Sequence, residues 1–211
     1  MKTMSFKQFQ ELLATVTRRL RNDMNAEEAQ RWIDDPNGRI DLVTNDESAA
    51  APAPNNLFEL VVSASVPDLL GFVAADNFKE DTKGAVRIWS LGDNFKKHFL
   101  KKAEEATAAT EVKVSKLLKQ SRDPAIMVEL GSGYELTLGQ FFHLLAKQGK
   151  GEKDGPLLVN GWANIAYIAD YEGTVWAVRA FWNAGLGGWC VGGSSVGHPY
   201  AWSEGHQLLS C

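Results

Sequence analysis

Apolar residues recur at three- and four-residue intervals in the first 35 residues, and this spacing predicts two amphipathic helices. Ser5 is a suitable N-cap for the first helix, and Gln8 completes a capping box three residues later. The second helix is expected to begin after Asn25 and to end at a turn that contains proline and glycine. We therefore predict an N-terminal helical hairpin over residues 1–43. Two such helices bury little apolar surface, so we expect them to pack on the rest of the chain or on a partner.

Residues 44–56 are polar, rich in alanine and interrupted by proline, which is typical of a linker. After this linker, the pattern predicts strands over residues 57–65 and 86–91, with a short helix that begins at Pro67. The chain therefore divides into the hairpin, the linker and a domain over residues 57–211.

The middle of that domain has the signals of three further helices. Asp93 is placed to cap the first of them, which directs Phe95 and Phe99 inward. The second begins at Pro124, and the third begins with a capping box between Thr137 and its Gln three residues later. The middle is therefore expected to be a mixed helical region.

Residues 111–120 are compatible with two structures. Val112 and Val114 alternate with polar residues as in a strand, whereas lysines recur every three residues from Lys113 to Lys119. A lysine at every third position is typical of a solvated helix face, and we prefer the helix.

The segment from Trp162 to Trp202 carries five of the seven tryptophans and many glycines, and it predicts a C-terminal antiparallel meander. If the first turn is centred on Tyr171 and Glu172, Ile165 faces Val178 and Tyr167 faces Trp176. The same register places Asn164 opposite Arg179 and Trp162 opposite Phe181. If the second turn is centred on Gly185 and Leu186, Trp182 faces Trp189 and Ala180 faces Val191.

These two registers predict sheet faces of different character. The expected core face carries Ile165, Tyr167, Trp176, Val178, Trp182, Trp189 and Val191. The expected outer face is a candidate ligand-binding surface that carries Trp162, Asn164, Arg179 and Phe181, with Cys190 beside them. Gly192 and Gly193 are expected beside Arg179 and Val178, where they leave room for another segment to approach. The predicted fold class is α+β, with the meander closed by the preceding helices.

Composition and charge add little to the predicted fold. The chain has 211 residues, a hydrophobic fraction of 45% and a net charge of −4, which argues against nucleic acid as a partner. Lysines near residue 100, from Lys96 to Lys102, are interpreted as a solvated helix face. No apolar run is long enough for a membrane span, and no signal peptide is recognised. Cys190 and Cys211 are expected to be free thiols, so we expect a cytoplasmic protein without membrane contact.

No motif in the chain predicts a reaction or a cofactor. The run from Gly193 to Gly197 matches G-x-S-x-G, but His198 and Pro199 follow it where a nucleophile elbow requires a helix. His198, His206 and the two cysteines have no zinc-module spacing, so neither a metal nor another cofactor is expected. The sequence favours a protein that is not an enzyme.

Three short motifs and a late tryptophan resemble those of a group of short bacterial proteins to which no activity is attached. The motifs are G-x-x-F-x-x-x-F over Gly92–Phe99, T-x-x-K-V over Thr110–Val114 and L-T-x-x-Q over Leu136–Gln140, and the late tryptophan is Trp202. The resemblance covers about residues 85–211. It implies an intracellular bacterial protein with helices followed by a tryptophan-rich sheet, and it implies no site residue.

The sequence leaves two functions open. The first is a non-catalytic interaction or assembly protein, which meets another protein chain through its N-terminal helices. The alternative is a module that binds a carbohydrate, a peptide or another small ligand through Trp162, Asn164, Arg179 and Phe181.

Overall fold

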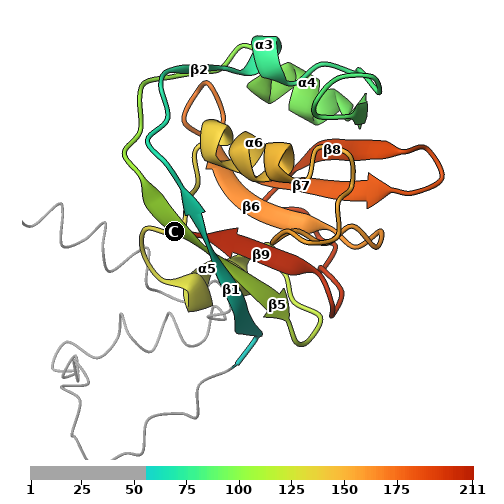
Figure 1. Cartoon of the computed structure of the whole chain (residues 1–211). Helices are drawn as coiled ribbons and strands as arrows, with labels where there is room; N and C mark the ends of the chain where they lie inside the picture. The colour runs from blue at the N-terminus through green and yellow to red at the C-terminus, as the bar shows by residue number, and fades with distance from the viewer. Residues whose placement is uncertain (1–55) are drawn as a thin grey trace, which may run out of the picture. The chain divides into compact units, whose positions relative to one another are not determined.

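A mixed β-sheet of seven strands is the centre of the computed structural model, which describes residues 56–211 (Figure 1). In spatial order its strands are β1 (Phe58–Val66), β5 (Thr110–Leu117), β9 (Gln207–Ser210), β6 (Asn164–Ala169), β7 (Val175–Asn183), β8 (Gly188–Ser195) and β3 (Ile88–Leu91). A two-stranded sheet pairs β2 (Phe72–Val73) with β4 (Ala103–Glu104). The helices of the described part are α3 (Ala74–Asn77), α4 (Asp93–Phe99), α5 (Asp123–Leu130) and α6 (Leu138–Lys147).

The predicted α+β fold class with a mixed helical middle and a C-terminal antiparallel meander is wrong, although β6, β7 and β8 do pair in antiparallel fashion. The described residues are mostly sheet, with four short helices, and the middle of the chain supplies β3 and β5 to the same sheet as the C-terminal strands. The sheet is mixed because β3 runs parallel to β8, and β9 runs parallel to β6. The predicted hairpin over residues 1–43 lies outside the described residues, as does the predicted linker 44–56 apart from its last residue. No helix in residues 56–211 is long and apolar enough to cross a membrane.

The preference for a helix over residues 111–120 is also wrong, since most of this segment is β5. β5 lies between β1 and β9, antiparallel to both. Val112 and Val114 are buried on one face, whereas Lys113 and Lys116 are exposed. The segment forms a strand because an inner strand gains hydrogen bonds on both edges. This tertiary pairing overrides the local helix propensity.

Capping signals in the sequence locate the helices better than lysine spacing does. α6 begins at the predicted capping box, in which Thr137 Oγ1 accepts a hydrogen bond from the Gln140 backbone N–H at 3.1 Å. α4 directs Phe95 and Phe99 inward as expected, although Gly92 is its N-cap. The helix predicted from Pro67 is wrong, because that segment bridges to Thr107 and continues into β2 before the single turn of α3.

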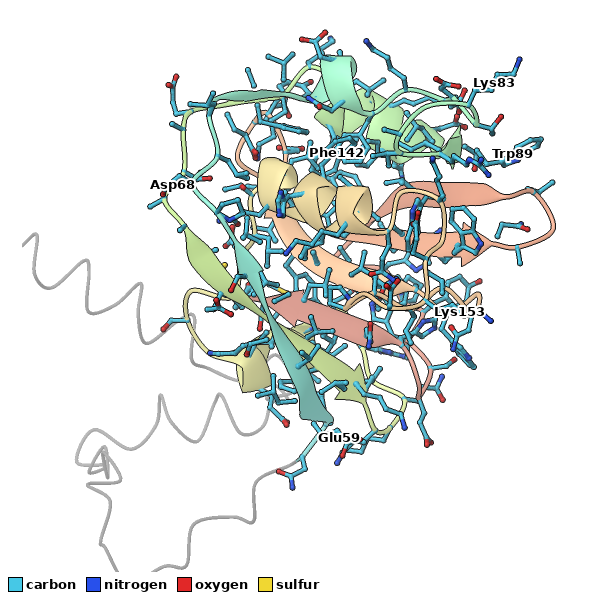
Figure 2. All side chains as sticks on the ribbon, in the orientation of Figure 1. Glu59, Asp68, Lys83, Trp89, Phe142 and Lys153 are labelled. Carbon is cyan, nitrogen blue, oxygen red and sulfur yellow. The ribbon has the colours of Figure 1, made fainter. Side chains whose placement is uncertain are left out.

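The two faces of the large sheet carry separate apolar clusters. We call one the Trp189 face; α4 and α6 cover it, and its strand residues include Ala166, Ile168, Val178, Ala180, Trp182, Trp189 and Val191. We call the other the Arg179 face; it carries Ile165, Tyr167, Ala177, Arg179 and Leu208, and Ile126 of α5 packs there. Phe142 extends the first cluster, since it points from α6 toward the layer of α3 and α4 (Figure 2). The Trp189 face therefore holds the larger core.

The first hairpin has a register one residue away from the prediction, whereas the second has the predicted register. Ile165 pairs with Arg179 rather than Val178, because Asp170 N–H donates to the Thr174 carbonyl at 2.8 Å and leaves a three-residue loop. Gly173 in that loop has φ +83°, as in a type I turn followed by a left-handed residue. Trp182 pairs with Trp189 as predicted. Because of this one-residue shift, the β6 side chains predicted on the core face lie on the opposite face. The side chains of β7 and β8 lie on their predicted faces.

Candidate functional site

The structure does not bring the four predicted ligand-binding residues together. Arg179 and Phe181 lie two apart on β7 and share the Arg179 face. Trp162 precedes β6 and remains 42% exposed. Asn164 lies on the opposite face, because it pairs with Ala180 instead of Arg179.

Asn164 is part of the fold rather than of a binding surface. Its side chain is buried, and its Oδ1 accepts a hydrogen bond from the Leu158 N–H at 2.8 Å. Its Nδ2 donates to the carbonyl of Leu158 at 3.0 Å and to that of Ala180 at 3.3 Å. The amide therefore holds the segment before β6 against the sheet.

A cavity of about 250 Å³ opens on the Arg179 face. Its lining residues come from the start of α5, from β7, from the end of β8 and from the segment that follows: Asp123, Arg179, Ser194, His198, Tyr200, Ala201 and Trp202. The backbone of Trp202 pairs with that of Ser121, with N–H to carbonyl distances of 2.8 and 3.0 Å in the two directions. This bridge fixes the last segment beside the beginning of α5, although the two are some eighty residues apart in sequence.

Arg179 supplies the positive charge of this cavity. Its Nη1 donates a hydrogen bond to Ser194 Oγ at 2.8 Å, and its guanidinium lies 5.9 Å from the Trp202 ring centre. Within residues 56–211 Arg179 forms no ion pair with a carboxylate, since the described ion pairs involve other residues. A half-buried guanidinium with one neutral hydrogen-bond partner retains donors for an anion.

Asp123 is the buried acid of the same cavity. Its Oδ1 accepts hydrogen bonds from Tyr167 Oη at 2.8 Å and from Trp202 Nε1 at 2.6 Å. Burial raises the pKa of Asp123 above its ordinary value, and the two hydrogen bonds oppose this effect only in part. The carboxyl fixes the indole of Trp202 at the cavity wall.

An aromatic row connects Trp162 to this cavity. The rings of Trp162 and His206 meet edge to face with centres 4.8 Å apart, and those of Trp202 and His206 do so at 5.7 Å. His206 Nδ1 accepts a hydrogen bond from the Ala163 N–H at 2.9 Å. Burial, together with the nearby Arg179 charge, lowers the pKa of His206, which favours the neutral ring. Trp162 therefore lies next to His206 on the side of the Arg179 face, but it does not line the cavity.

Sequence reasoning missed most of the cavity wall. No pattern singles out Asp123, since the predicted helix begins at Pro124, and Ser194 enters only as part of G-x-S-x-G. The signal for Trp202 was its place in the resemblance. These residues meet because the 198–202 segment folds back on α5, a contact that no local pattern encodes.

The G-x-S-x-G run ends a strand and enters a turn. Ser195 is the last residue of β8 and is exposed, and the His198 N–H donates to its carbonyl at 3.0 Å. Ser194, not Ser195, lines the cavity. Among the described residues no group of three or more histidine, cysteine or acidic side chains is placed to hold a metal, and both cysteines are free thiols.

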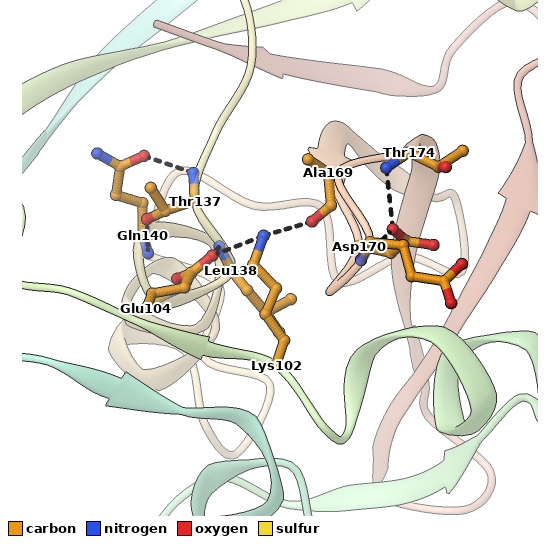
Figure 3. A network of polar contacts seen from close by, with 10 residues as sticks. Lys102, Glu104, Thr137, Leu138, Gln140, Ala169, Asp170 and Thr174 are labelled. Carbon is orange, nitrogen blue, oxygen red and sulfur yellow. Dashed lines mark hydrogen bonds and ion pairs between the residues drawn. The ribbon is translucent and has the colours of Figure 1, made fainter.

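A second polar cluster, on the Trp189 side of the sheet, is saturated by its own contacts (Figure 3). Glu104 accepts hydrogen bonds from the backbone N–H groups of Leu138 and Gly139, each at 2.8 Å, at the start of α6. Lys102 bridges Glu104, at 3.1 Å, and the carbonyl of Ala169. This cluster joins α6 to the end of β6 and leaves its charges paired, so the cavity at Arg179 is the stronger candidate site.

The chain matches no protein-family model, no curated protein sequence and no solved structure.

Proposed function

We propose that this chain is a binding module that takes a carboxylate group of its ligand in the cavity at Arg179. The observation that carries the proposal is the Arg179 guanidinium, which lies on the cavity wall bonded to a serine hydroxyl and to no described carboxylate. A planar guanidinium matches a carboxylate through two parallel hydrogen bonds. Among the ligand classes expected from the sequence, this group favours an anion over a neutral sugar.

The other lining residues support a ligand with one charged end. His198 Nδ1 accepts a hydrogen bond from the Tyr200 N–H at 3.3 Å, so the neutral ring carries its hydrogen on Nε2 as a further donor. The Trp202 indole, fixed by Asp123, supplies an apolar wall. Ligand pockets commonly combine such walls with a few polar groups that fix orientation.

Interaction with another protein chain through residues 1–43 stays a prediction, because those residues lie outside the described part. The proposal made for the cavity is independent of it. A binding module and an interaction protein are also compatible if the ligand is part of a protein.

The experiment is a titration of the full chain with butyrate and benzoate, followed by NMR at the tryptophan indoles. The matching amides, butyramide and benzamide, have similar shapes without charge. For ligands this small we expect dissociation constants on the order of millimolar. The carboxylates should shift the Trp202 indole signal, and the amides should not.

Arg179→Met tests the charge, because methionine retains an apolar stem. We expect it to weaken carboxylate binding about tenfold or more, as loss of a charged hydrogen bond of about 1.5–3 kcal/mol implies. Arg122→Met is the matched control, since Arg122 is exposed, lies just before Asp123 and does not line the cavity. Equal binding of acids and amides, or unchanged binding by the Arg179 variant, would overturn the proposal.

A further inference from the structure

An open apolar groove of about 650 Å³ lies next to the cavity. It is lined by Pro124, Met127, Val128, Gly131, Tyr134 and Val196. Val128 is 81% exposed, although most exposed helix positions carry polar residues. An aliphatic side chain this exposed at the edge of a groove is typical of an interaction surface.

α5 has apolar residues on more than one side. Ile126 packs into the core of the Arg179 face, Met127 and Leu130 are half-buried, and Val128 points to solvent. A short helix that is apolar on several sides is normally enclosed by protein. Within residues 56–211 only one side of α5 is enclosed, so the described part of the chain leaves the groove side uncovered.

The groove and the cavity share the same two segments of chain. Asp123 lines the cavity and the next residue, Pro124, lines the groove. At the end of β8, Ser194 and His198 line the cavity, and Val196 between them lines the groove. A ligand with its charged end at Arg179 can therefore continue directly onto the apolar surface.

We propose that the ligand is the C-terminal end of a protein or peptide, with its carboxylate at Arg179 and its last apolar side chains in the groove. This inference rests on the proposed function of the cavity. A volume of about 250 Å³ is below the usual range for a complete small-molecule site, about 300–1,000 Å³, and suits an end group whose remainder lies elsewhere. Recognition of a C-terminal carboxylate together with side-chain pockets is a recurring mode of peptide binding.

The shape of the groove favours a peptide over a fatty acid. An acyl chain in an open groove keeps one side in water along its whole length, whereas an extended peptide directs alternate side chains to solvent. Beyond Val191, where its pairing with β3 ends, the outer edge of β8 has no strand partner among the described residues. Among the described residues Asn94 reaches that edge, through a hydrogen bond to the Gly193 carbonyl at 3.2 Å.

The test uses the full chain and fluorescein-labelled hexapeptides, with binding measured by anisotropy. One peptide ends in Leu-Val with a free carboxylate, a second has the same sequence with a C-terminal amide, and a third ends in Ser-Ser with a free carboxylate. We expect the first to bind about tenfold or more tightly than either of the others, since an aliphatic side chain buried in the groove and the ion pair at Arg179 each contribute more than 1.4 kcal/mol.

Val128→Asp separates this inference from the proposed function. It should remove the advantage of the Leu-Val peptide over the Ser-Ser peptide and leave butyrate binding in place. Leu70→Asp is the matched control, because Leu70 is 87% exposed and lies outside the groove. Val196→Ser provides a second groove variant with the same expectation.

The measurements distinguish failure of the groove inference from failure of the cavity proposal. If butyrate binds but the Leu-Val peptide gains nothing, or Val128→Asp has no effect, the groove inference is wrong and the cavity proposal stands. If octanoate binds more tightly than the peptide and responds to Val128→Asp, the ligand is a lipid and the peptide is excluded. If no carboxylate binds, both proposals fail.

Discussion

The two faces of the central sheet differ in how they treat polar groups. On the Trp189 face, the buried side chains of Asn164 and Gln148 form hydrogen bonds within the chain, and most of the other buried residues are aromatic or aliphatic. Gln207, which pairs with Asn164, is an exception, since its buried Oε1 has no hydrogen-bond partner among the described residues. On the Arg179 face, the apolar cluster is smaller, and Arg179 and Asp123 border a cavity. Under the proposed function, one sheet separates stability from recognition, because a core favours paired polar groups and a binding site requires polar groups that still have free donors.

The largest expected effect is on the Trp189 face. Trp189 is fully buried, its Nε1 donates to the Gln148 carbonyl at 3.0 Å, and its ring meets Trp182 edge to face at 5.6 Å. We expect Trp189→Ala to lower the free energy of unfolding by about 3–5 kcal/mol, the usual cost of such a cavity. Urea denaturation followed by circular dichroism measures it.

Trp162→Ala is the matched control on the other face. Trp162 is 42% exposed and packs mainly on His206, so its loss should cost about 1 kcal/mol or less. Similar losses for the two tryptophans would contradict the division of the sheet into a structural and a binding face.

Asn164→Ala is expected to have the next largest effect. It leaves the N–H and carbonyl of Leu158 without their side-chain partner, and we expect a loss of about 2–3 kcal/mol. Asn183→Ala is the control, because that side chain accepts one hydrogen bond in an exposed turn and should cost less than half as much. Butyrate binding by the folded Asn164→Ala protein should be unchanged; a selective loss of binding would restore Asn164 to the site.

The hydrophobic pattern predicted which strands form the second hairpin but not how the first one is aligned. A turn centred on Gly185 and Leu186 predicts the register of β7 and β8, including Trp182 opposite Trp189 and Gly192 beside Arg179, and the structure confirms both pairs. In the first hairpin, the side chain of Asp170 accepts hydrogen bonds from the N–H groups of Glu172 and Thr174, each at 2.9 Å. That contact selects the three-residue loop, and one residue of slip moved Asn164 out of the predicted site.

Arg179 is the only residue lining the cavity that the sequence predicted as a ligand-binding residue. Its place on the less apolar side of β7 follows from alternation with Val178 and Ala180. Asp123 and Trp202 meet through a fold-back of the C-terminal segment. Likewise, β5 is a strand because of its neighbours on both sides, and these non-local pairings are absent from any window of sequence.

The charge state of Asp123 gives a smaller, pH-dependent effect. Since burial raises the folded-state pKa above the unfolded value of about 3.9, the protonated carboxyl stabilises the fold fully below that value, and this stability is lost as pH rises through the folded pKa. Asp123→Asn stays neutral, and its Oδ1 can accept the hydrogen bonds of Tyr167 and Trp202. The variant should therefore gain stability relative to the native chain as pH increases from about 4 to 7.

Urea denaturation of both proteins at several pH values measures this difference. A difference that does not change with pH, or that changes in favour of the native chain at higher pH, would show that Asp123 is stabilised in its ionised form.

Gly192→Ala is expected to have the smallest effect. A Cβ at this position would lie 3.7 Å from the Arg179 guanidinium, which is ordinary van der Waals contact. The free energy of unfolding should change by no more than about 0.5 kcal/mol, because the cavity side of the strand has room for a methyl group. Butyrate affinity should also remain within about threefold, because the methyl group meets the guanidinium without removing a donor. A loss of stability above about 1 kcal/mol would mean that Arg179 is packed against β8 as tightly as a core residue. The contrast between the two faces would then lie in charge alone and not in packing.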